Sequence, residues 1–327
     1  MRNLSTEAAI WNLYSSAEFF EAAANECDRI VEWFGTLAIS RKVANFGRNN
    51  QIYDTFKALA SDFRRGAEMA KLGDYEFIWR TARCVGGDIR GIMEQPLHSW
   101  MTEAEYQEFG GVRVSRLLAY AGMITTALNN AMTAADSFFE PDPDYPEQSD
   151  DDGGFPGDKI LRLYEGYCQR FDGVPFPTIP DPLPEYAIDR SVACRTGDEV
   201  PWTGVWYPDT GLERHSLAFA IKGLRMQPAF RIVKTEGELE RENEGVMFYS
   251  PETVALATTW HPVIPSGRQV ENDKELRAKA GEPCPKAGVW QPMDADAMQQ
   301  RTYEVGETMT NLGSAYGITV WRWIGDR

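Results

Sequence analysis

The stretch GDEVPWTGVWYP, residues 197–208, recurs as GEPCPKAGVWQP at residues 281–292. The two stretches share a glycine, a proline and a closing Gly-Val-Trp-x-Pro run at identical spacing. A match of this kind at fixed spacing is the signature of an internal repeat, in which one supersecondary unit has been duplicated. We therefore expect two copies of one structural unit in the C-terminal half of the chain.

The match continues beyond these stretches. Gly223-Leu-Arg-Met226 corresponds to Gly306-Glu-Thr-Met309 after a one-residue contraction, and an apolar strand candidate follows each, at 229–233 and 318–324. Thr259-Trp-His-Pro262 is a further strand-end candidate. Short Val, Ile, Trp and Tyr runs between turn residues are typical of strands, and one such unit can hardly bury its own apolar face. These patterns predict a β-rich domain, 190–327, with pseudo-repeats at about 194–235 and 279–324.

Four residues occupy equivalent places in the two copies: Gly204 and Trp206 in the first, Gly288 and Trp290 in the second. Residues retained at repeat positions are mainly packing residues, so we interpret these four as structural anchors. Trp202 is replaced by Lys286 in the second copy and is free of that argument. Because aromatic residues are favoured at interfaces, Trp202 is a candidate contact with a partner.

The N-terminal half has a helical pattern instead. Apolar residues at three-to-four-residue spacing predict a helix of about eight turns capped by Ser5 or Thr6. Further helices are expected from Ile52 to near Gly73, from Asp74 towards Gly86-Gly87, after a capping box at Thr102–Glu105, and from about 112 to 136 at the centre of a bundle. The fold class is therefore α+β, with an antiparallel helical bundle, 1–172, before the β-rich domain.

Two segments between the halves are predicted to lack packed elements. Residues 138–158 carry eight carboxylates with repeated Pro and Gly, which predicts an acidic loop. A short helix is expected at about 158–171. Repeated prolines then predict an extended, stiff linker over residues 173–189.

The charge balance restricts the partners. With 33 Lys and Arg against 49 Asp and Glu, the net charge is −16, which opposes binding to nucleic acid and to anionic membrane surfaces. A basic protein would be attracted instead. Acidity also keeps a protein soluble, so the charge alone does not establish a partner.

Cysteine usage and the N-terminus favour a cytoplasmic protein. The five cysteines lie far apart and form no C-x-x-C pair, which suggests neither a disulfide framework nor a zinc site. The first residues lack a signal-peptide pattern, and the uncharged stretch 117–135 contains polar residues that favour a buried helix over a membrane span. No cofactor is expected.

Familiar catalytic motifs, such as a phosphate loop, a dinucleotide fingerprint or a nucleophile elbow, are lacking in the sequence. The alternative of a hydrolase or transferase rests on Cys194, His215 and His261, or on a carboxylate pair that the fold brings together. Isolated residues of these types more often serve packing, and the second copy has Gln299 or Gln300 in place of His215. We therefore assign no catalytic residue.

The run Asp150-Asp151-Asp152-Gly153 lacks the alternating spacing of a calcium loop. A solvated acidic loop is its simplest interpretation. A more specific hypothesis is that the carboxylates of Asp150, Asp151 and Asp152 mimic phosphate groups and contact a basic partner protein. No metal site is assigned there.

Four segments of the C-terminal half form a recognisable pattern: Gly281-Glu-Pro-Cys-Pro285, Gly288-Val-Trp290, Tyr303–Met309 and Gly317–Trp323. With these segments the C-terminal half resembles immunity proteins of bacterial polymorphic toxin systems, of the immunity protein 71/72 type. Thr310 stands where the family pattern has proline. The resemblance implies a cytoplasmic antitoxin that binds a toxin delivered by a secretion apparatus, such as type VI secretion, without catalysis. It names no toxin, and a homodimer through exposed repeat edges stays open.

Overall fold

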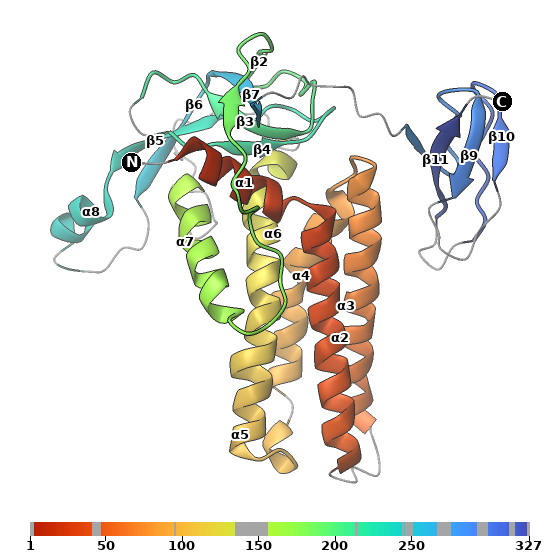
Figure 1. Ribbon diagram of the computed structural model, residues 1–327. Helices are drawn as coiled ribbons and strands as arrows, with labels where there is room; N and C mark the ends of the chain where they lie inside the picture. Colours follow the sequence, from red (N-terminus) through yellow and green to blue (C-terminus); the bar gives the residue numbers. More distant parts are fainter. Residues whose placement is uncertain are drawn as a thin grey trace, which may run out of the picture.

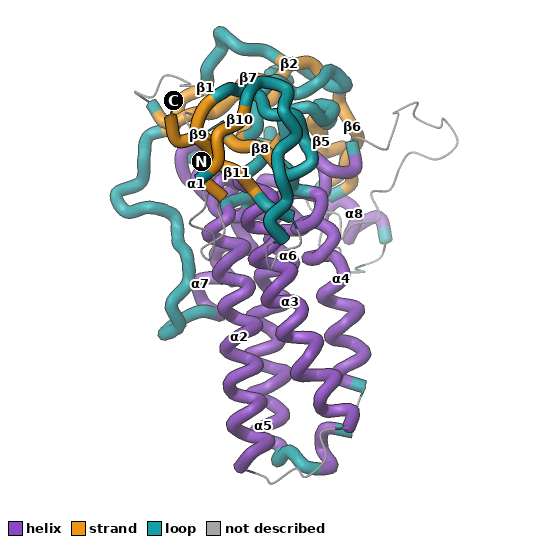
Figure 2. Tube along the Cα trace, turned by 90° about the vertical axis from the view of Figure 1, so that its right-hand side faces the viewer, coloured by secondary structure: helices purple, strands orange, loops and turns teal. Residues whose placement is uncertain are grey.

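The structure is a computed structural model, which describes residues 3–40, 47–94, 96–134, 156–212, 215–243, 245, 251–266, 276–292, 300–313 and 318–325. Figure 1 shows a bundle of long helices with β-sheets at one end, and Figure 2 shows the same segregation from the side. The α+β class predicted from the sequence is confirmed. The acidic residues Asp150, Asp151 and Asp152 lie outside the described residues.

Helices α2, α3, α4 and α6 form the body of the bundle. α2 packs against α3 and α6, and α4 packs against the same two helices. Apolar side chains at helical spacing turn one stripe of each helix inwards, and the central helix α6 buries residues on several sides. The helix bounds are α1 Leu4–Tyr14, α2 Ala17–Ser40, α3 Gly47–Lys71, α4 Glu76–Met93, α5 Glu103–Tyr106, α6 Ser115–Thr133 and α7 Pro156–Arg170, with a 3₁₀ turn η1 at Leu97–Ser99.

The first predicted helix was wrong in its extent and its cap. Asn3 is the N-cap, and the chain breaks at Ser15 and Ser16 into α1 and α2. The Ser15 hydroxyl donates to the Trp11 carbonyl at 2.8 Å, and the Ser16 hydroxyl accepts from Phe19 N at 3.1 Å. Because serine side chains compete for helical backbone groups, this pair ends one helix and caps the next.

A π-helix, η2, joins α5 to α6 over Gln107–Val114. Its start follows the capping box predicted from the sequence, in which Thr102 Oγ1 accepts from Glu105 N. Gly110 lies where a Cβ atom would meet the Met93 side chain at 2.8 Å. The glycine pair that interrupts the sequence pattern therefore marks a change of helix type with close packing against α4, and the helix continues through it.

After α7 the proline-rich segment lies against the bundle as a strap. The Tyr167 hydroxyl donates to the Pro177 carbonyl at 3.1 Å, and Ile179 N donates to the Tyr164 hydroxyl at 3.3 Å. The Phe176 ring packs edge-on against Tyr167. The segment is extended, and aromatic packing and hydrogen bonds fix it to α7. Residues 186–188 of the predicted linker form strand β1, which pairs with β7, so this part is a packed element and not a linker.

The first β-sheet has the order β1-β7-β3-β4, with β2 also paired to β7, and all pairs are antiparallel. One face of this sheet belongs to the same buried cluster as the bundle, through Val205, Phe219, Ile221 and Val263. The helices and this sheet therefore share one core. The strands are β1 Tyr186–Ile188, β2 Cys194–Arg195, β3 Gly204–Pro208, β4 Ala218–Ala220 and β7 Thr259–Pro265.

The second sheet, with the order β10-β9-β11-β8, has a separate buried cluster. Two polar contacts connect it to the bundle: Arg277 Nη1 donates to the Lys71 carbonyl at 3.0 Å, and Lys279 Nζ lies 2.7 Å from Asp74 Oδ2. A cation beside the last carbonyls of α3 is favourable. The strands are β8 Arg277–Lys279, β9 Gly288–Pro292, β10 Arg301–Tyr303 and β11 Val320–Gly325.

Candidate functional site

The two repeat copies are built as two equivalent β units. We call β2, β3, β4 and β7 the first unit, and β8, β9, β10 and β11 the second unit. Gly197 N donates to the Met226 carbonyl at 2.8 Å, and the equivalent Gly281 N donates to the Met309 carbonyl at 2.8 Å. Since both units repeat the same backbone hydrogen bonds, the sequence repeat corresponds to one framework formed twice.

The tryptophans of the repeat lie at the centre of each unit. Trp206 and Trp290 are both fully buried. Trp206 Nε1 donates to the Trp202 carbonyl at 3.2 Å, and Trp290 Nε1 donates to the Lys286 carbonyl at 3.0 Å. A buried indole N–H needs an acceptor, and the loop before the Gly-Val-Trp run supplies it.

The glycine of the Gly-Val-Trp run is covered by an indole in both units, but from different sources. A Cβ atom at Gly204 would lie 2.2 Å from the Trp202 ring, and one at Gly288 would lie 2.4 Å from Trp323 Nε1. Trp202 is thus half-buried within the first unit. In the second unit Lys286 replaces Trp202, and its Nζ lies 3.5 Å from the centroid of the Trp323 ring. The indole that covers Gly288 is therefore that of Trp323, from β11.

The repeat correspondence inferred beyond the two methionines was wrong. β11 pairs with β9 and β8, and the strand that makes the equivalent pairs with β3 and β2 is β7. Trp260 is therefore the counterpart of Trp321, and both are buried. A Thr-x-Trp pattern, at Thr258 and Thr319, was the sequence signal that marks this match.

The strand predicted at 229–233 belongs to an insertion in the first unit. β5, Ala229–Lys234, pairs with β6, Glu252–Leu256, and the short helix α8, Glu236–Glu242, follows β5. We call residues 229–256 the arm. Figure 1 shows the arm directed away from the bundle, on the side opposite to the second unit.

The units also differ in the sheet face that lies opposite to the buried tryptophans. In the first unit this face packs on the helices through Phe219 and Ile221, which are 3% exposed. The strand registers place Thr302 and Glu304 at the equivalent positions of the second unit, and both are exposed. The face that is buried in the first unit is consequently polar and open in the second.

The Cys194 thiol lies in the core of the first unit. Burial raises the pKa of Cys194 to about 11, and the negative charge of Asp198 acts in the same direction. A thiol with this pKa is almost entirely protonated at neutral pH, whereas the thiolate is the nucleophile. Cys194 is therefore placed for packing.

Neither histidine activates this thiol. Cys194 faces Trp260 across the strand pair, so His261, the next residue of β7, points to the opposite face. His261 Nδ1 lies 2.8 Å from the Val192 carbonyl, which can only accept, so this nitrogen carries the proton. His215 packs edge-on against the Tyr207 ring. The geometry thus disfavours the Cys/His alternative.

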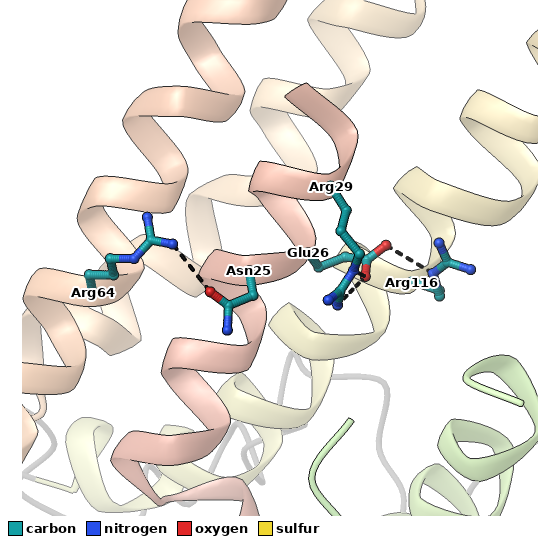
Figure 3. A network of polar contacts seen from close by, with 5 residues as sticks. All are labelled: Asn25, Glu26, Arg29, Arg64 and Arg116. Atoms are coloured by element: carbon teal, nitrogen blue, oxygen red, sulfur yellow. Dashed lines mark hydrogen bonds and ion pairs between the residues drawn. The ribbon is translucent and has the colours of Figure 1, made fainter. Parts of the chain in front are cut away.

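A buried ion cluster lies between α2 and α6 (Figure 3). Glu26 is fully buried, and its carboxylate accepts from Arg116 Nε at 2.9 Å and from Arg29 Nη2 at 2.7 Å. Arg64 of α3 donates to Asn25 at 3.2 Å and also pairs with Asp28. Because two arginines surround one carboxylate, the Glu26 charge is fully compensated.

In the part of the chain that the structure describes, no helix is long and apolar enough to cross a membrane, and no group of three or more His, Cys, Asp or Glu side chains is arranged to hold a metal ion. No family model matches the chain, and no match was found among the curated proteins or the solved structures.

Proposed function

We propose that this chain is an immunity protein, which binds a cognate bacterial toxin domain in the cytoplasm and neutralises it by stoichiometric contact. The resemblance of 281–323 to immunity proteins gives the class. The physical support comes from how the second unit is presented to solvent and from the charge of the chain.

The open face of the second unit is the observation that carries this proposal. The same face in the first unit packs against the helices of the chain, whereas in the second unit it is open to solvent, which supports a role as a contact surface. In the second unit the equivalent positions carry the exposed Thr302 and Glu304, and the neighbouring Gln291 is partly exposed. Polar groups of this kind can supply the direct hydrogen bonds that protein–protein interfaces contain.

The net charge of −16 supports a basic partner. Complementary charge accelerates association and excludes wrong partners, and its effect decreases with salt. Many toxins that act on nucleic acid or nucleotides need basic grooves, and a protein of this charge would be attracted to such a groove. The buried, protonated Cys194 adds nothing that favours a hydrolytic reaction.

The test is co-expression of the chain with the toxin-like product encoded beside it, with cell survival and co-purification as readouts. Survival together with a stable complex that weakens with salt is expected. A chain that protects cells against none of the toxins encoded nearby would falsify the proposal.

A pair of matched variants locates the contact. Thr302→Arg places a large charge on the open face, on its edge strand β10, and Thr36→Arg makes the same change at an exposed position of α2. We expect the first to weaken the complex and the second to leave it unchanged. Equal affinities for both variants would remove the open face from the interface.

A further inference from the structure

The arm has no counterpart of similar length in the second unit. There, 11 residues, 310–320, separate Met309 from Trp321 in the sequence, and both of these residues belong to the buried cluster. The first unit needs residues 227–259 between the equivalent Met226 and Trp260. Insertions in one copy of a repeat commonly lie on the binding side of the protein. The arm is therefore a candidate for a function other than folding.

The arm is a two-stranded ribbon with little support from the body. In the described chain, β5 and β6 pair only with each other, from Ala229 opposite Leu256 to Lys234 opposite Glu252. Ala229 is the arm residue that enters a buried cluster. A ribbon of two strands is marginally stable in water by itself, and a third strand would stabilise it.

The strand β6, Glu252–Leu256, carries its one charge at the first residue, which follows Pro251. The rest of the strand, Thr253 to Leu256, reads Thr-Val-Ala-Leu and carries no charge, in a chain in which 25% of residues are charged. Natural edge strands carry lysine, proline or bulges that prevent pairing with other chains. The facing strand β5 has Arg231 and Lys234, so the unprotected edge belongs to β6.

We infer that the β6 edge receives an extended segment of the toxin domain as a third strand of the ribbon. This inference rests on the proposed function and adds a second contact to the same complex. Strand addition of this kind obtains affinity from main-chain hydrogen bonds and specificity from alternate side chains. Val254 and Leu256, on one face of the ribbon, are partly exposed and require apolar residues at alternate positions of the incoming strand.

The charges at the outer end of the ribbon select a basic strand. Lys234 Nζ lies 2.6 Å from Glu242 and 3.9 Å from Glu252, so one cation faces two carboxylates. A lysine or arginine on the incoming strand would compensate the second carboxylate. Pairing of two copies of this chain would instead bring together two molecules of net charge −16, which mutual repulsion opposes.

The second unit provides the design for the decisive variant. Residues 227–257 are replaced by residues 310–318, which lie between Met309 and the equivalent Thr319 in the second copy of the sequence repeat. Thr258 is kept because its carbonyl accepts from Thr196 N at 3.0 Å, as the Thr319 carbonyl accepts from Ala280 N at 2.8 Å. We expect this armless variant to fold, with unchanged helical circular dichroism.

A point variant tests the edge without a deletion. Ala255→Lys adds a charge to the exposed centre of β6. Its matched control is Ala187→Lys, which changes an exposed alanine at the centre of β1, another edge strand. If the armless variant does not fold, this pair still decides the question.

The readouts are survival, the Kd of the purified complex and amide hydrogen exchange of β6. The armless variant and Ala255→Lys are expected to bind about 100-fold more weakly, while Ala187→Lys binds like the native chain. Slower exchange of β6 on toxin binding is also expected. An Ala255→Lys variant that protects and binds normally overturns the inference, as does unchanged exchange of β6, and the proposed function then stands. A native chain that binds no toxin overturns both.

Discussion

Replacing Arg116 by leucine should destabilise the bundle strongly, because it removes one of two partners of a carboxylate that is 0% exposed. Breaking a buried ion pair from one side costs about 3–5 kcal/mol, since the remaining charge is left buried. Arg29 still contacts Glu26, and its side chain is 31% exposed. We therefore expect a loss near the lower limit, about 3 kcal/mol in the free energy of unfolding.

The double variant Glu26→Leu with Arg116→Leu separates the ion pair from packing. When both charges are removed together, an apolar pair of similar volume is often as stable as the ion pair. Arg29 can then extend to solvent. The double variant should lie within about 1 kcal/mol of the native chain. Arg64→Leu is the surface control, because Arg64 and Asp28 are 33% and 50% exposed and such pairs contribute about 0.5 kcal/mol.

Urea unfolding followed by far-ultraviolet circular dichroism is the appropriate assay, because the helices dominate this signal and the second unit, which has its own core, contributes little to it. With an m value of about 3 kcal/mol per molar, the midpoint of the Arg116→Leu variant should fall by about 1 M. The reasoning is refuted if Arg116→Leu unfolds at the native midpoint, or if the double variant is no more stable than the single one.

Three further predictions concern single positions. Gly288→Ala places a Cβ atom 2.4 Å from Trp323 Nε1 and should destabilise the second unit by about 2 kcal/mol, visible as faster amide exchange in β9. Gly91→Ala meets nothing within 4 Å inside α4 and should stabilise the helices by about 0.5–1 kcal/mol in urea unfolding. Burial raises the pKa of Cys194 to about 11, so iodoacetamide at about pH 8 should modify the exposed Cys84 and leave Cys194 unmodified, as measured by mass spectrometry. The reactivity of Cys194 should rise only as the pH approaches 11. Equal modification rates of the two thiols at pH ~8 would contradict the burial argument.

The helices were largely predictable because amphipathic spacing and caps are local signals. The face of α3 from Ile52 to Ala70 and the capping box at Thr102 were both read correctly from the sequence. The break at Ser15 was not, because the apolar spacing continues through it while the serine hydroxyls change the backbone hydrogen bonds. Spacing reports which residues face a core, and it does not report where backbone hydrogen bonding changes.

In each copy of the repeat, the β unit was predictable only as far as its matched methionine, Met226 in the first copy and Met309 in the second. An apolar run after Met226 suggested a strand equivalent to the last strand of the chain, yet that run pairs with β6 inside the arm. Strand partners are long-range contacts, so a run of strand-forming residues does not identify its neighbour. The shared core between the helices and the first unit was missed for a related reason, because Phe219 and Ile221 read only as generic strand residues.

The duplication separates the residues that build the unit from those that distinguish one copy from the other. Each of the six described core residues of the second unit has a counterpart in the core of the first: Cys194 and Ala278, Val200 and Cys284, Trp206 and Trp290, Ala220 and Tyr303, Met226 and Met309, Trp260 and Trp321. Residues that match between copies therefore report the framework. The positions that differ, namely the open face at Thr302 and the arm around Ala255, are where recognition can evolve without loss of folding. For that reason the differences between the copies, more than their conserved tryptophans, are the place to look for the toxin contact.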